Sequence, residues 1–159
     1  MLKYTLILTF ICLTIISVKS QSFNSDKTAF SNFIKRMYTS SPFEGVKIVD
    51  DYEHQYLISV ISLEKAKYTS ESTMNRVAQV KAQSQANTFI NGSNISMDMV
   101  IRTTEIKDST NTKTIVESVE TIKENASGFT QGMELLSNFD NQDNLRKVFV
   151  YCREMKKED

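Results

Sequence analysis

Apolar residues recur at every fourth position before Gly92, and this repeat predicts a long α-helix. The repeated positions are Met74, Ala78, Ala82, Ala86 and Ile90. The middle three are alanine, so this face can approach a β-sheet closely at its centre, while larger side chains fill the wider gaps at its ends. Hydroxyl and carboxylate side chains in segment 69–73 are candidates for the helix start, and Asn91-Gly92 is a typical helix end.

The remaining surface of this helix is polar, and we expect it to face solvent. Its residues are Arg76, Gln79, Lys81, Gln83, Gln85 and Asn87. The face that contacts the rest of the protein is therefore the alanine-bearing one. We interpret its flatness as a packing feature and not as a ligand site.

A second helical pattern covers residues 27–38, near the amino terminus. Its apolar stripe consists of Phe30, Phe33, Ile34, Met37 and Tyr38. Ser25 or Asp26 can cap its start, and Pro42 marks its end. A stripe of this size needs a cover, which is either the chain's own sheet or another molecule. We expect the chain's own sheet to provide it.

Elsewhere the apolar residues alternate with polar ones, which predicts β-strands. Residues 46–60 have this pattern with a polar break at Asp50-Asp51, and they predict a hairpin. Further strands are predicted within 94–106, 112–124, 128–139 and 145–155. Helices do not alternate with these strands, so we expect an antiparallel sheet. The predicted fold class is α+β, with about five to six strands, one long helix packed across them and a short N-terminal helix.

The first twenty residues have the pattern of a secretory signal peptide. Lys3 precedes an uncharged apolar run of residues 4–18, which is shorter than the roughly 20 residues of a membrane-spanning helix. We expect cleavage near Ser20-Gln21 and export to the periplasm, the outer envelope or the extracellular space. Residues 21–159 would then form a single exported domain without a transmembrane segment.

Composition bears mainly on the partners of the protein. The full chain has 19 basic and 19 acidic residues, and loss of Lys3 and Lys19 would leave 17 basic ones. This near-balance provides no electrostatic reason to expect nucleic acid as a partner. The mature chain would retain one cysteine, Cys152, which we expect to be a small buried apolar residue. An intermolecular disulfide is the alternative.

The order of elements resembles a family of small bacterial envelope proteins, the Lpp-twenty lipoproteins, which are related to the amino-terminal domain of the flagellar protein FlgT. Two pairs of segments carry the resemblance: "MNRVAQVKAQSQANTFING" with "NISMDMVIRTTE", and "GFTQGMELLSNF" with "KVFVYC". It covers about Val46 to Cys152 and implies a dodecin-like α+β fold without known catalysis. This chain differs in lacking a usable lipobox, because Phe10 and Ile11 precede Cys12.

The sequence contains no recognisable catalytic, cofactor-binding or metal-binding constellation. One histidine and one cysteine in the mature chain, His54 and Cys152, are too few for a zinc site. We therefore expect a non-catalytic binding or assembly module, whose partner is another envelope protein or a second copy of the chain. The alternatives are a small enzyme with an unrecognised site and an apolar-ligand carrier that uses Met97, Met99 and Met133.

Overall fold

The computed structural model describes residues 22–51, 54–92, 100–102, 119–123 and 125–155. The chain divides into two compact units, Met1–Arg36 and Met37–Asp159. The boundary lies inside the first described helix, and the second unit contains the whole sheet. The predicted cleavage site lies outside the described residues.

The amino-terminal helix α2 spans Ser22–Ser40, which confirms the helix predicted for residues 27–38 and extends it by about two turns. Ser25 and Asp26 lie inside this helix and do not cap its start. At its end the amide of Ser41 and the hydroxyl of Ser40 both donate to the carbonyl of Met37, each at 2.9 Å. These bonds satisfy a terminal carbonyl that the helix itself leaves without a partner. Pro42 follows, as expected for a residue that interrupts helices.

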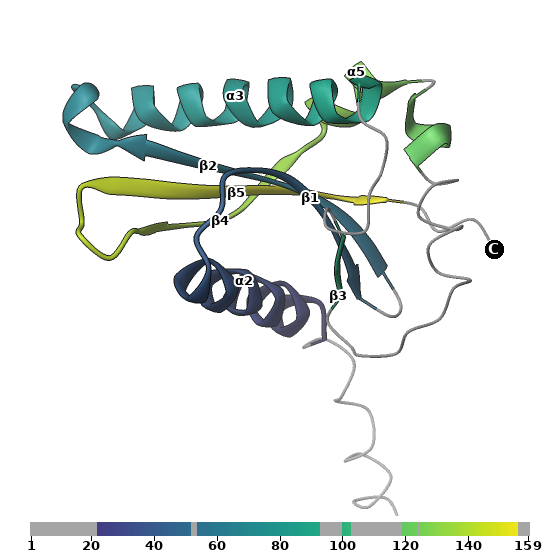
Figure 1. Ribbon diagram of the computed structural model, residues 1–159, viewed down its shortest axis with the longest axis horizontal. Coiled ribbons are helices and arrows are strands. Elements are labelled where there is room, and N and C mark those ends of the chain that lie inside the picture. The colour runs from purple at the N-terminus through teal and green to yellow at the C-terminus, as the bar shows by residue number, and fades with distance from the viewer. Residues whose placement is uncertain (1–21, 52–53, 93–99, 103–118, 124, 156–159) are drawn as a thin grey trace, which may run out of the picture. The chain divides into compact units, whose positions relative to one another are not determined.

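Five strands form one sheet in the order β3-β1-β2-β5-β4 (Figure 1). Their bounds are β1 Gly45–Asp51, β2 His54–Glu64, β3 Val100–Arg102, β4 Glu134–Asp140 and β5 Arg146–Met155. The chain enters β1 through Gly45, whose φ of 112° favours glycine. The predicted hairpin is confirmed, but Asp50 and Asp51 belong to β1, and Asp51 is opposite His54.

The predicted α+β fold class is confirmed, with a mixed sheet in place of a purely antiparallel one. The pairs β1–β2, β2–β5 and β4–β5 are antiparallel, whereas β1–β3 is parallel, with Val49 opposite Ile101. Alternation along residues 94–106 indicates a strand but not its direction. β3 lies at the edge of the sheet, beside β1.

The long helix α3 spans Glu71–Gly92 and lies along one face of the sheet (Figure 1). It starts where predicted: the hydroxyl of Ser70 accepts the amide of Thr73 at 3.2 Å, and the carbonyl of Ser70 accepts that of Met74 at 3.1 Å. Its buried residues are Met74, Ala78, Ala82, Ala86, Phe89 and Ile90. The prediction of a close alanine contact with the sheet is therefore confirmed.

The polar side of α3 is less exposed than predicted. Gln83, Gln85 and Asn87 are only partly exposed. Ser59 of β2 donates to Gln85 Oε1 at 3.2 Å, and Gln83 donates to the carbonyl of Gln131 at 3.4 Å. The close approach that alanine allows brings these flanking glutamines within reach of the sheet and of the next helix.

Two strand predictions are wrong in part. Residues 119–123 are helical, and helix α5 spans Ala126–Gln131, so the strand predicted within 128–139 begins only at Glu134. Asn125 caps α5 by accepting the amide of Gly128 at 3.1 Å. Val119 and Ile122 are three positions apart, a spacing that also fits one helical face, so short apolar runs leave the choice open. Residues 112–118 lie outside the described residues.

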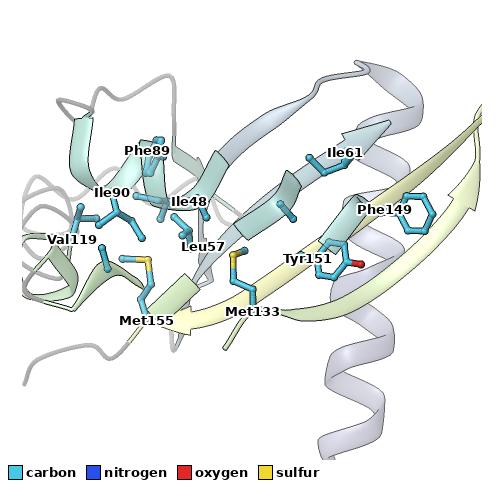
Figure 2. Packing of buried hydrophobic residues seen from close by; sticks show 14 of the residues in the cluster. Ile48, Leu57, Ile61, Phe89, Ile90, Val119, Met133, Phe149, Tyr151 and Met155 are labelled. Carbon is cyan, nitrogen blue, oxygen red and sulfur yellow. The ribbon is translucent and has the colours of Figure 1, made fainter. Parts of the chain in front are cut away.

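The main core fills the space between the sheet and α3 (Figure 2). At one end Ile90 of α3 lies close to Val119, Leu57 and Met155, and at the other Phe149 lies close to Ile61. The opposite face of the sheet is also apolar. Its fully buried residues are Val49, Ile58, Val60, Val148 and Val150. Near this face, Tyr38 contacts Phe139 edge to face, with ring centroids 5.5 Å apart.

Candidate functional site

A cleft of about 340 Å³ opens at the amino-terminal end of α3, and it is the candidate site of the described part of the chain. Five segments contribute to it, namely the 3-10 helix η1 (Lys65–Lys67), the turn before α3, the first turn of α3, the end of β4 and the start of β5. Its lining residues are Lys65, Tyr68, Thr69, Ser70, Glu71, Met74, Asp140 and Lys147. Most of the lining is therefore polar.

The sheet register brings the distant parts of this cleft together. Asp140 is opposite Lys147 in the β4–β5 pair, and Lys147 is opposite Leu63 in the β2–β5 pair. The amide of Lys65 donates to the carbonyl of Leu145 at 3.0 Å, which fixes η1 beside the turn before β5. The floor of the cleft thus belongs to the sheet, and its wall is the start of α3.

The charges in the cleft are matched in pairs. Lys65 Nζ lies 2.9 Å from Asp140 Oδ1, and Lys147 Nζ contacts Glu71 Oε1. Glu71 also lies in the first turn of α3, where the helix dipole favours a negative charge. An anionic ligand at this helix end would therefore compete with a carboxylate that is already in place.

A second ionic cluster lies next to the cleft, around Arg146. Its guanidinium donates to the hydroxyl of Ser62 at 2.6 Å and to the carbonyl of Ser62 at 2.7 Å. It also donates to Glu64 at 3.3 Å and to Glu44 at 3.4 Å. A hydrogen bond and positive charge from Lys67, with a smaller contribution from Arg146, lower the pKa of Glu64 below its usual 4.5. This cluster ties β2 to β5 and uses four of the five guanidinium N–H groups.

Histidine and cysteine side chains can form a nucleophilic pair when they lie within hydrogen-bond reach, and the structure separates His54 from Cys152. His54 is exposed at the end of β2, and its Nδ1 lies 2.8 Å from Glu154 Oε1. Cys152 is opposite Ile58, four residues along β2 from His54, which is a separation of roughly 13 Å along the strand. The two side chains therefore do not form a catalytic pair. Cys152 is also only partly buried, which corrects the expectation of a fully buried residue.

Of the three methionines considered for an apolar ligand site, Met133 is among the described residues. Met133 is buried in the core cluster, in the segment between α5 and β4. Met97 and Met99 lie outside the described residues. Met133 therefore contributes to packing between the sheet and the helices that cover it.

Sequence patterns alone did not identify the cleft. Its lining comes from residues 65–74, Asp140 and Lys147, and these segments are far apart in the chain. Only the helix start at Ser70 and Glu71 was predicted, from capping chemistry. Asp140 lies opposite Lys147 only in the register set by the β4–β5 turn. In this turn Asn144 has a φ of 59°.

Within the described ranges, no cluster of three or more histidine, cysteine, aspartate or glutamate side chains could hold a metal ion. The helices of those ranges include none that combines the length and apolar character needed to cross a membrane. No protein-family model matches the chain, and neither does any curated protein or solved structure. The resemblance to the Lpp-twenty and FlgT families stays a prediction.

Proposed function

We propose that the protein is an exported, non-catalytic binding or assembly module that recognises a partner through the cleft at the start of α3. The observation that carries this proposal is the pairing of Lys65 with Asp140 and of Lys147 with Glu71. General acid–base catalysis needs a group positioned to exchange a proton with a substrate. In this cleft each charged group already has an opposite charge in contact.

The same arrangement suits recognition of a polar protein segment. Around the two ion pairs, Tyr68 and Thr69 offer hydroxyl groups at the cleft, while the hydroxyl of Ser70 is bonded to Thr73. A partner strand or loop that carries both charges can exchange ion pairs with the cleft without leaving a buried charge unmatched. The partner class we favour is another envelope protein, with a second copy of this chain as the alternative.

Export is part of the same proposal. The apolar run of residues 4–18 has the length of a signal peptide core and is followed by Ser20. We propose cleavage near Ser20-Gln21 and a periplasmic, outer-envelope or extracellular location for the mature chain. Mass spectrometry of the native protein tests this directly, because a mature chain starting at Gln21 is expected and retention of residues 1–20 contradicts it.

Site-specific photo-crosslinking in the native host tests the binding proposal. A photoreactive amino acid at Thr69, inside the cleft, is expected to give a discrete cross-linked product of one defined mass. The matched control is the same replacement at Thr88, an exposed threonine on α3 outside the cleft lining. Equal products from both positions, or none from Thr69, would remove the cleft as the recognition site.

A separate measurement addresses the enzymatic alternative. The purified mature protein is tested for hydrolysis of ester, phosphoester, peptide and glycoside substrates, together with a Thr69→Arg variant that fills the cleft. We expect no turnover above the buffer rate with either protein. Turnover by the unmodified protein that Thr69→Arg abolishes would identify the cleft as an active site and overturn the non-catalytic assignment.

A further inference from the structure

Among the described residues, Gln55 of β2 is a buried glutamine whose side chain has no hydrogen-bond partner. It is 1% exposed, and both Oε1 and Nε2 are fully buried without a hydrogen bond. Burial of an amide without a partner is costly, and buried polar groups in proteins nearly always have one. This residue lies far from the cleft and takes no part in the proposed recognition.

The sheet register defines the surroundings of Gln55. It is directly opposite Asp50 of β1 on one side and Met155 of β5 on the other. Side chains alternate along a strand, so Gln55 shares the α3-facing side with Leu57 and with Ser59, which bonds to Gln85 of α3. Asp50 is also buried, at 5% exposure. The amide and the carboxylate are therefore cross-strand neighbours on the covered face of the sheet.

We propose that Gln55 and Asp50 hold one internal water molecule. A primary amide presents a donor and an acceptor side by side, so one water can accept from Nε2 and donate to Oε1. Its second hydrogen then points to the Asp50 carboxylate, which can accept several hydrogen bonds. Three hydrogen bonds are typical of a buried water.

The geometry favours a bridged contact over a direct one. Directly opposed residues in an antiparallel pair have Cβ atoms about 4.5–5.5 Å apart, yet the Gln55 amide makes no hydrogen bond to Asp50. A water bridges polar groups that are too far apart for direct bonding. The site therefore belongs to the end of the β1–β2 pair and stabilises its register inside the core.

Cross-relaxation between water and the side-chain amide protons of Gln55 tests this proposal in the intact mature protein. A long-lived water gives a rotating-frame signal whose sign is opposite to that of chemical exchange. We expect this signal at Gln55. The internal control is Gln85, a glutamine of the same interface whose Oε1 has a protein donor, and it should lack the signal. Absence of the signal at Gln55, including through a direct bond to Asp50, overturns the proposal.

The nearly isosteric change Gln55→Met provides a second measurement. If a water satisfies the amide, Gln55→Met removes two of the three hydrogen bonds of that water, and the melting midpoint should fall by about 3 °C or more. If the amide is unsatisfied, Met relieves its burial and the midpoint rises, which overturns the proposal. A Gln55→Met chain that does not fold counts as the first result, and the cross-relaxation measurement on the unmodified protein then decides.

Discussion

Enlarging Ala82 should destabilise the protein more than the same change at an exposed helical position. Ala82 is 0% exposed and lies between Ala78 and Ala86 on the face of α3 that contacts the sheet. Ala82→Leu adds three carbon atoms at a fully buried position of this face. Overpacking of this kind costs about 1–3 kcal/mol. Displacement of α3 would also weaken the Ser59–Gln85 hydrogen bond, at a further cost of about 1 kcal/mol.

Urea unfolding of the mature protein measures this effect. The control is Ala29→Leu, the same chemical change at an exposed alanine of α2, which should shift the unfolding free energy by less than about 0.5 kcal/mol. Gln83→Leu is a poor control, because Gln83 is partly buried and bonds to Gln131. If Ala82→Leu and Ala29→Leu give equal unfolding free energies, the inference that Ala82 packs tightly against the sheet is wrong.

Three further changes test other parts of the structure. Arg153 donates to the carbonyls of Gly128 and Phe129, and its guanidinium lies 4.6 Å from the centre of the Phe129 ring. Arg153→Met should therefore lower the free energy of unfolding by about 1.5–3 kcal/mol in urea melts. The control Arg76→Met, at an exposed position of α3, should change it little. A Cβ at Gly132 would overlap the Arg153 guanidinium, so Gly132→Ala should destabilise the protein. The same change should have a smaller effect in a chain that already carries Arg153→Met. Strictly additive changes in unfolding free energy would contradict this coupling. Burial raises the pKa of Tyr151 above its usual 10.0, because the folded state favours the neutral phenol. The contribution of this neutral phenol to stability is therefore complete below pH 10 and is lost as the pH rises through the folded-state pKa. Ultraviolet titration should show this raised pKa, and a normal pKa for Tyr151 would refute its burial.

The parts of the fold that the sequence predicts best are those with a long, unambiguous period. The four-residue repeat from Met74 to Ile90 extends over more than four turns, and all its members are buried. Alternation in residues 145–155 likewise marks β5, which is ten residues long. In α3 the repeat is long enough to exclude the competing period, whereas β5 is recognised by a run of four apolar residues, Val148 to Tyr151, that are buried on both faces of the sheet.

Short segments were predicted less well, because their apolar residues fit two periods. Val119 and Ile122 read as strand positions but are helical, and the same applies to Phe129 and Thr130 in α5. The local feature that favours a helix here is the cap at Asn125, whose side-chain Oδ1 accepts the Gly128 amide. Asn followed by Ala and Ser resembles ordinary loop sequence, so the cap was not recognised as a helix start.

The charges of the cleft show why chemistry was harder to predict than fold. Lys65, Lys147, Glu71 and Asp140 look like unrelated surface residues in the sequence, since a balanced composition contains many such side chains. They become a site only because β4 and β5 pair with Asp140 opposite Lys147 and because α3 starts beside them.

The alanine contact holds α3 close to the sheet along its length, so it also sets how near Glu71 comes to Lys147. Ala82→Leu should therefore weaken partner cross-linking from Thr69 as well as stability, whereas Ala29→Leu should leave both unchanged. Loss of stability with unaltered cross-linking would separate the helix contact from the recognition site and show that the cleft is shaped by its own turn, residues 65–70.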